Sequence, residues 1–173
     1  SFGGTWDFFK YPGIRSDSDM STFGFNFKPW QKANVLADGA SIKGYLLEVL
    51  DEYKLKEKIH FQHRVLAANY DSTQKKWLVE IEDVNQKKQT WIANFVLGCT
   101  GYYNYDQGFQ PNFPNQQAFK GQLIHPQFWP ADLQYAGKKV VIIGSGATAI
   151  TLVPALAKGG VEHVTMLQRS PTY

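Results

Sequence analysis

Hydrophobic residues after residue 40 recur at the spacing of one helix face. This predicted helix carries its apolar residues at Ile42, Tyr45, Leu46, Val49, Leu50 and Tyr53. Ser41 and Asp38 are both candidates for its N-terminal cap. Strand-like patterns then occupy residues 59–70, 77–81 and 91–97, with turn-forming residues at 71–75 and 85–88. The pattern therefore predicts a helix followed by a small antiparallel meander.

The pattern changes near the end of the chain. Residues 138–143 predict a buried strand, residues 147–158 a helix, and residues 164–168 a second buried strand. Residues 1–40 and 98–137 are rich in glycine, proline and aromatic residues and have no sustained period, so both predict long loops. A domain boundary is expected near residues 120–137.

Composition and charge exclude several classes of protein. The net charge of +3 comes from scattered basic residues, which argues against nucleic-acid binding. No apolar run is long enough to cross a membrane, and no signal peptide opens the chain. The single cysteine, Cys99, suits a cytoplasmic location. His60, His63 and His163 lack the spacing of metal ligands, so no metal is expected.

A glycine-rich motif lies between the last predicted strand and helix. The run from Gly144 to Ala149, GSGATA, fits G-x-G-x-x-G/A, which is a weak signal alone but stronger between a strand and a helix. Gly144 would allow the tight turn, and Gly146 would let a pyrophosphate approach the backbone. The helix start at Ala147 and Thr148 would offer N–H groups to the phosphates. A glycine turn without a ligand is the alternative.

The end of the second strand distinguishes between nicotinamide cofactors. NAD sites usually carry an acidic residue there, whereas this chain has Arg169 and Ser170. An arginine and a hydroxyl group would bind a 2′-phosphate, so NADPH is favoured over NADH. A surface arginine at a strand end is the competing interpretation.

Four motifs together resemble class B flavin monooxygenases. They are Gly3-Gly4-Thr5-Trp6, the loop from Tyr11 to Asp17 (YPGIRSD), Cys99-Thr100-Gly101, and the run from Phe119 to Pro130 (FKGQLIHPQFWP). The last resembles the fingerprint of the Baeyer–Villiger branch, because related N- and S-oxidising enzymes usually carry Tyr or Phe where Trp129 stands. The runs YPGIRSDSDM and GSGATAITLVPALA resemble the ethionamide-activating type of this branch.

The resemblance implies an α/β fold, namely part of a flavoprotein with two dinucleotide-binding domains for FAD and NADP. Residues 1–122 would be the C-terminal part of the FAD-binding domain. Residues 123–137 would be a linker with the fingerprint, and residues 138–173 would begin the NADP-binding Rossmann domain. A first FAD-binding βαβ unit would precede Gly3, and more of the NADP domain would follow Tyr173. We therefore expect an internal fragment, inactive and weak in FAD binding by itself.

The resemblance also implies an oxidoreductase that uses FAD and NADPH. Reduced flavin would react with O₂ to give a C4a-peroxide, which attacks a ketone and yields an ester or lactone, and which can also oxidise sulfur. The flavin carries the chemistry, and the protein supplies orientation and charge. The partners would therefore be O₂ and a small ketone or sulfur compound.

Candidate residues follow from the matched motifs. Arg15 and Asp17 would be catalytic, with Asp17 orienting an arginine at the flavin, although a turn-forming role for Asp17 is the alternative. His125 is a candidate acid or base, but a linker role between the two nucleotide domains is preferred. The expected FAD contacts come from Gly4, Thr5, Trp6, Asp17, Val65, Thr100 and Gly101. Val65 could equally be a core residue.

Two other classes of function compete with this one. The first comprises N- or S-oxidising flavin monooxygenases and disulfide reductases, although a reductase lacks support because the chain has no cysteine pair. The second is an inactive dinucleotide-binding piece.

Overall fold

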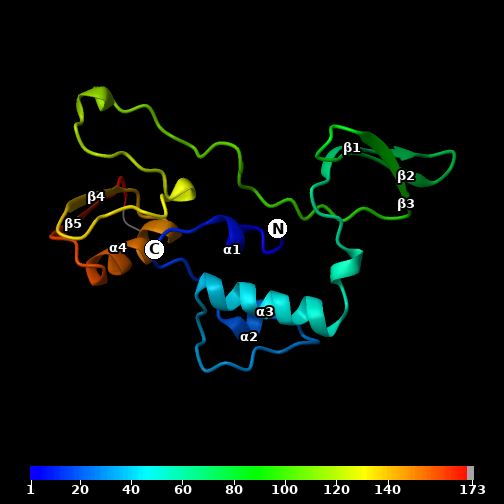
Figure 1. Cartoon of the computed structure of the whole chain (residues 1–173), viewed down its shortest axis with the longest axis horizontal. Coiled ribbons are helices and arrows are strands. Elements are labelled where there is room, and N and C mark those ends of the chain that lie inside the picture. The colour runs from blue at the N-terminus through cyan, green and yellow to red at the C-terminus, as the bar shows by residue number, and fades with distance from the viewer. Residues whose placement is uncertain (171–173) are drawn as a thin grey trace. The chain divides into compact units, whose positions relative to one another are not determined.

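The computed structural model describes residues 1–170. Contacts divide the chain into two compact units, Ser1–Tyr53 with Asn104–Tyr173, and Lys54–Tyr103. Figure 1 shows the elements in chain order, and each unit is described by itself. These boundaries follow contacts and differ from the predicted division at residues 122 and 137, which concerns nucleotide binding and stays a prediction.

The predicted amphipathic helix is α3, Gly39–Glu52. Asp38 is its N-cap, because one carboxylate oxygen accepts a hydrogen bond from the Ser41 N–H at 2.8 Å. The Ser41 hydroxyl donates to the other oxygen of the same carboxylate at 2.8 Å. The buried face of α3 includes Ile42, Tyr45 and Val49, as its periodicity predicts.

The expected loop over residues 1–40 contains two helices of one turn, α1 (Thr5–Phe8) and α2 (Met20–Phe23). A single turn is too short to leave a period in the sequence, so the pattern missed both. The Asp19 carboxylate caps α2 by accepting from the Thr22 N–H at 2.9 Å. Met20, Ala37 and Ile42 form a buried cluster that ties α2 to α3.

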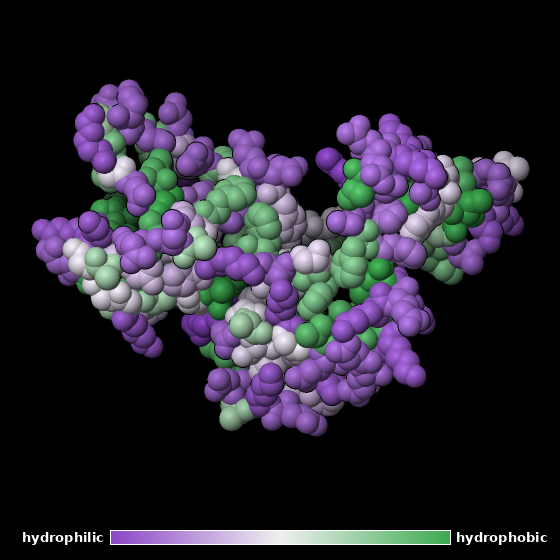
Figure 2. Space-filling view, in the orientation of Figure 1, coloured by the Kyte–Doolittle hydropathy of each residue, from purple (hydrophilic) through white to green (hydrophobic). Residues whose placement is uncertain are grey.

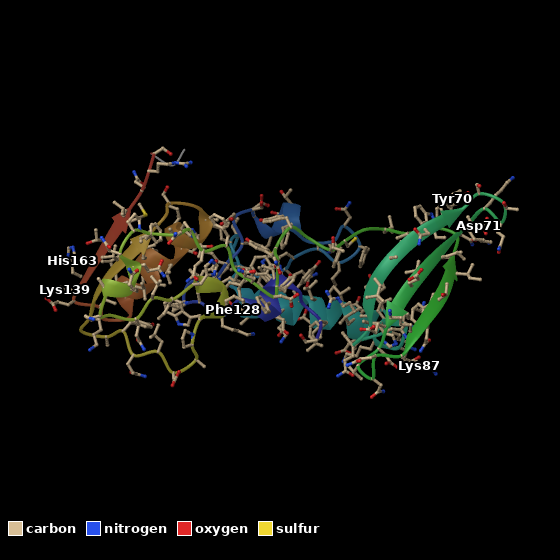
Figure 3. The ribbon with its side chains drawn as sticks, turned by 90° about the horizontal axis from the view of Figure 1, so that it is seen from above. Tyr70, Asp71, Lys87, Phe128, Lys139 and His163 are labelled. Carbon is tan, nitrogen blue, oxygen red and sulfur yellow. The ribbon has the colours of Figure 1, made fainter. Side chains whose placement is uncertain are left out.

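The second unit is the predicted antiparallel meander, preceded by the 3₁₀ turn η1 (Lys56–Lys58). Its strands are β1 (Arg64–Asp71), β2 (Lys76–Glu82) and β3 (Lys88–Ala93). The turns lie next to Asp71 and Lys87, which are labelled in Figure 3. Val65 and Ile92 are exposed apolar residues of this sheet. Figure 2 shows hydrophobic surface over this unit.

Two strand boundaries in this unit were predicted wrongly. The first strand begins at Arg64, not at residue 59. The third strand covers residues 88–93 instead of 91–97, because β2 supplies partners only from Glu82, opposite Lys88, to Trp77, opposite Ala93. The β-rich run at 94–97 lies beyond the last of these pairs, so its composition misled the prediction.

The last part of the chain forms the predicted βαβ unit. β4 (Lys139–Ile143) and β5 (His163–Leu167) pair in parallel, and α4 (Ala147–Lys158) connects them with the predicted bounds. The sequence predicted that both strands would be buried, but Val141 of β4 is 61% exposed. Within the described residues this sheet has two strands, and its inward side chains pack into the cluster that contains Leu152 and Leu156 of α4.

The segment before β4 contains two 3₁₀ turns, η2 (Gln116–Ala118) and η3 (Pro126–Phe128), within the predicted loop. Trp129 and Tyr135 of this segment pack against the cluster that also contains residues of α4. Phe9 and Tyr11, from the start of the chain, are buried there against Leu152 and Leu156. The main core of the first unit therefore joins the two ends of the chain.

Candidate functional site

The glycine loop between β4 and α4 presents an open backbone surface. Gly144 has a φ of 125° and donates its N–H to the Leu167 carbonyl at 2.8 Å, which fixes the loop beside the end of β5. A Cβ added at Gly144 or Gly146 would meet no atom within 4 Å. The first intrahelical hydrogen bond runs from the Ile150 N–H to Gly146, so the first-turn N–H groups, including those of Ala147 and Thr148, lack intrahelical acceptors.

Arg169 and Ser170 lie just beyond the strand end that holds this loop. Both are exposed, and Arg169 follows Leu167 by two residues. The structure thus brings the predicted glycine-loop residues close to a cation and a hydroxyl group at one edge of the sheet. Free N–H groups, a positive helix end and an arginine fit a phosphate-bearing nucleotide.

The predicted catalytic loop is held in a defined conformation. Tyr11 to Ile14 form a type II turn, with proline second, Gly13 third at a φ of 85°, and a hydrogen bond from the Ile14 N–H to the Tyr11 carbonyl. Ser16 is buried and exchanges hydrogen bonds with the Ala37 backbone at 2.8 and 3.1 Å. The chain is extended here, so Arg15 and Asp17, on either side of Ser16, are both exposed.

The predicted flavin contacts of the first unit lie around α1. Gly3 and Gly4 have positive φ values, of 104° and 49°, which let the backbone turn into the helix. Thr5 is partly buried. Trp6 packs against the Met20 cluster, with its ring 6.0 Å from the Phe23 ring.

Sequence reasoning missed Asp7, which lies in the same turn. Its carboxylate pairs with Lys43 of α3 and accepts a hydrogen bond from Ser1, while Lys10 lies 3.7 Å away. The hydrogen bond from Lys43 and then that from Ser1 lower the pKa of Asp7 to about 2. The Gly-Gly-Thr-Trp turn is therefore anchored to α3 by a charged contact, which no local pattern could have indicated.

The fingerprint residues make packing contacts in the chain. His125 lies at the start of η3, where its Nδ1 accepts from the Gln127 N–H at 3.2 Å. Gln127 is buried, and its side-chain amide donates to the Asn104 carbonyl at 2.6 Å. This hydrogen bond ties His125 to the buried Gln127 of the same turn, and both its linker role and its acid–base role stay predictions.

Aromatic residues complete the anchoring of the fingerprint. The Trp129 ring lies 6.1 Å from that of Tyr135, and both pack against the cluster that includes Leu152. Phe128, labelled in Figure 3, lies 6.0 Å from Phe8 of α1. The fingerprint therefore contacts both the segment that carries the Gly-Gly-Thr-Trp motif and the core around α4.

Three predicted FAD contacts belong to the second unit. Val65 is 60% exposed in β1 and pairs with Ile81, so it is not a core residue of this chain. Thr100 and Gly101 are exposed, and Gly101 has a φ of 70° with open space where a Cβ would lie. These features leave all three available to a ligand.

The described residues contain neither a group of metal ligands nor a helix that could cross a membrane. Across residues 1–170, no three His, Cys, Asp or Glu side chains are grouped so that they could hold a metal ion. His60 and His63 instead pack around Trp91, with ring centroids 4.7 and 5.8 Å from it. Within the same range, no helix combines the length and apolar character that a membrane crossing requires.

A family model described as flavin-binding monooxygenase-like matches residues 11–172. The chain belongs to this family. Over all 173 residues it is 80% identical to a probable FAD-binding monooxygenase, AlmA, of Acinetobacter baylyi and 57% identical to the FAD-containing monooxygenase EthA of Mycolicibacterium smegmatis. It spans 35% of the length of each relative.

Solved structures agree with this family and with the predicted α/β flavoprotein fold. A steroid monooxygenase bound to NADP matches with a TM-score of 0.79 and 28% identity, covering 98% of this chain and 32% of that one. A cyclohexanone monooxygenase from Rhodococcus sp. Phi1 bound to NADP+ matches with a TM-score of 0.74 and 29% identity, with the same coverage. FAD and NADP, the predicted cofactors, are both present in another matching structure, named OTEMO.

Proposed function

We propose that this chain is part of an FAD- and NADPH-dependent monooxygenase of the Baeyer–Villiger type, which converts ketones to esters or lactones and can oxidise sulfur. The main support for NADPH binding in this proposal is the glycine loop, which is fixed beside the strand end that leads to Arg169. Trp129 in the fingerprint favours the Baeyer–Villiger branch, and solved ketone and steroid monooxygenases share the fold. Bound FAD would supply the redox chemistry with O₂, and NADPH the reducing equivalents.

Each part of the chain has a role in this proposal. Residues 1–122 contribute to FAD binding, residues 123–137 form the linker, and the segment from residue 138 binds NADPH. The α4 N-terminus binds the pyrophosphate, while Arg169 and Ser170 bind the 2′-phosphate. Gly4, Thr5 and Trp6 of the first unit, and Val65, Thr100 and Gly101 of the second, contact FAD.

The exposed loop residues would act at the flavin. Asp17 orients a cationic side chain there, and Arg15 adds positive charge where an oxyanion develops. Arg15 and Asp17 both face solvent, and the hydrogen bonds of Ser16 fix the backbone between them. Such positions suit side chains that must contact a bound cofactor. The exposed, unpaired Cys99 fits the cytoplasmic location that the sequence favours.

A chimeric enzyme tests the reaction. Residues 1–173 replace the aligned segment of the Acinetobacter baylyi relative, with which they share 80% identity. The purified chimera should carry FAD, oxidise NADPH when a ketone is present, and yield the ester with one atom from ¹⁸O₂. Sulfoxide from a thioether, with no ester from any of a panel of linear and cyclic ketones, would instead support an N- or S-oxidising enzyme.

The Arg169→Ala substitution tests the nucleotide site in this chimera. Loss of one charged contact to the 2′-phosphate costs roughly 1.5–3 kcal/mol, so kcat/KM should fall by roughly 10- to 150-fold with NADPH and little with NADH. Lys139→Ala is the matched control, because Lys139 is an exposed cation at the opposite end of the same sheet, paired with Glu162. Equal losses with both nucleotides would exclude the 2′-phosphate assignment.

A further inference from the structure

The loop that carries Arg15 and Asp17 rests directly on the helix that follows the glycine motif. A Cβ at Gly13 would lie 2.4 Å from the Thr151 carbonyl oxygen and 2.8 Å from the Ala155 Cβ. Thr151 is buried in α4, and its carbonyl is backbone that cannot swing aside. Gly13 therefore contacts α4 at a distance that no other residue type would permit.

The same loop is held on its other side by the start of α3. The Gly39 N–H donates to the Ile14 carbonyl at 3.0 Å, and a Cβ at Gly39 would lie 3.2 Å from Ile14 Cγ2. The Ser16 N–H donates to the Ala37 carbonyl at 2.8 Å. The backbone of residues 13–16 is thus held between two helices, so the backbone positions of Arg15 and Asp17 follow those helices.

The α4 helix has the proposed nucleotide site at one end and this contact near the other. Ala155 lies eight residues after Ala147, or about 12 Å along the helix axis. Leu152 and Leu156, on the same helix, are buried against Phe9 and Tyr11, next to the loop. A close-packed helix moves as a unit, so a change in its position at the nucleotide end reaches Gly13.

We propose that Gly13, Thr151 and Ala155 form a positioning contact, through which the nucleotide-binding helix sets the place of Arg15 and Asp17 relative to the bound nucleotide. This inference rests on the proposed function, because it uses the NADPH site at the α4 N-terminus. It assigns Ala155 a positioning role in oxygenation that requires no contact with either cofactor.

Two substitutions on one helix separate this role from general effects on α4. Ala155→Val enlarges the residue that faces Gly13, whereas Ala157→Val makes the same change at an exposed position one residue beyond Leu156. Both introduce the same β-branched side chain into the helix. In the chimeric enzyme, Ala155→Val should lower the ester formed per NADPH oxidised on the order of tenfold, while the KM for NADPH changes by less than about twofold.

A spectroscopic measurement distinguishes positioning from loss of structure. NADP+ should perturb the absorption of bound FAD differently in Ala155→Val than in the unsubstituted chimera, and Ala157→Val should match the unsubstituted chimera. If Ala155→Val does not retain FAD, the smaller change Ala155→Ser replaces it. Equal behaviour of the substitutions at 155 and 157, in product yield and in spectrum, would overturn the proposal. A chimera that makes no oxygenated product at all would instead count against the proposed function, and the FAD spectrum would still test the contact.

Discussion

Replacing Gly13 with alanine should destabilise the first unit far more than the same change at Gly160. The two glycines have nearly equal φ values, of 85° and 81°, so an alanine side chain meets the same left-handed backbone at both. They differ in their surroundings, because a Cβ at Gly13 would strike the Thr151 carbonyl, whereas at Gly160 it would meet no atom within 4 Å. The pair therefore isolates the contact with α4.

The magnitudes follow from these two terms. A left-handed conformation costs an L-residue roughly 1–2 kcal/mol, and restriction of the unfolded chain by alanine offsets about 0.4–1 kcal/mol of that cost. Gly160→Ala should thus lower the free energy of unfolding by roughly 0–1.6 kcal/mol. Overpacking against Thr151 and Ala155 adds roughly 1–3 kcal/mol at Gly13. At about 2–4 °C per kcal/mol for a chain of this size, Gly13→Ala should lower Tm by several degrees more than Gly160→Ala.

Thermal unfolding followed by circular dichroism gives the two Tm values, and hydrogen exchange locates the change. Faster exchange after Gly13→Ala is expected in α4 and near Ala37, which the loop also contacts, with little change in β1–β3 of the second unit. Equal Tm shifts for the two substitutions would refute the close approach of Gly13 to α4.

Three further predictions concern charged groups. Asp38→Ala should lower the free energy of unfolding by about 1 kcal/mol in urea titrations, whereas Asp38→Asn, which can still cap α3, should cost less. Because the pKa of Asp7 is depressed, its pairing with Lys43 stabilises the fold fully above pH 3.8, and this stabilisation is lost as the pH falls toward about 2. The contribution is on the order of 1 kcal/mol after solvent screening. Urea titrations should therefore show a smaller loss of stability in acid for Asp7→Asn than for the unsubstituted chain, and an equal loss would contradict the prediction. In the chimera, Asp17→Ala should reduce ester formation more than NADPH binding, and unchanged product formation would exclude its proposed role.

The parts of the fold that were predicted from sequence are those governed by local pattern. The α4 helix was predicted with its observed bounds despite Pro154, because apolar residues flank it at helical spacing. Pro154 lies on an exposed face, so the carbonyl of Ile150, which loses its helical partner, can be hydrated. The third strand of the meander failed because pairing with β2, rather than composition, determines where β3 ends.

In the candidate site, too, features with a local sequence signature were predictable, whereas contacts between distant residues were not. The glycine loop and Arg169 were predictable, since a strand, a tight turn and a helix leave a local signature. The anchoring of the Gly-Gly-Thr-Trp turn by Asp7 and Lys43 was not, because these residues are 36 positions apart. The contact of Gly13 with α4 joins residues that are more than a hundred positions apart, and no periodicity reports such a pair.

The glycines of these motifs serve two different purposes, which the space around each one distinguishes. Gly144 and Gly146 face open space, which suits a loop that a phosphate approaches. Gly121 instead lies against the Phe119 ring, and Gly13 contacts helix backbone. A ring can rotate away from an added methyl group but a buried carbonyl cannot, so tolerance to alanine should be lowest at Gly13. A glycine in a motif that carries candidate catalytic residues can therefore be required by packing, and at Gly13 that packing connects the proposed nucleotide site to the proposed catalytic loop.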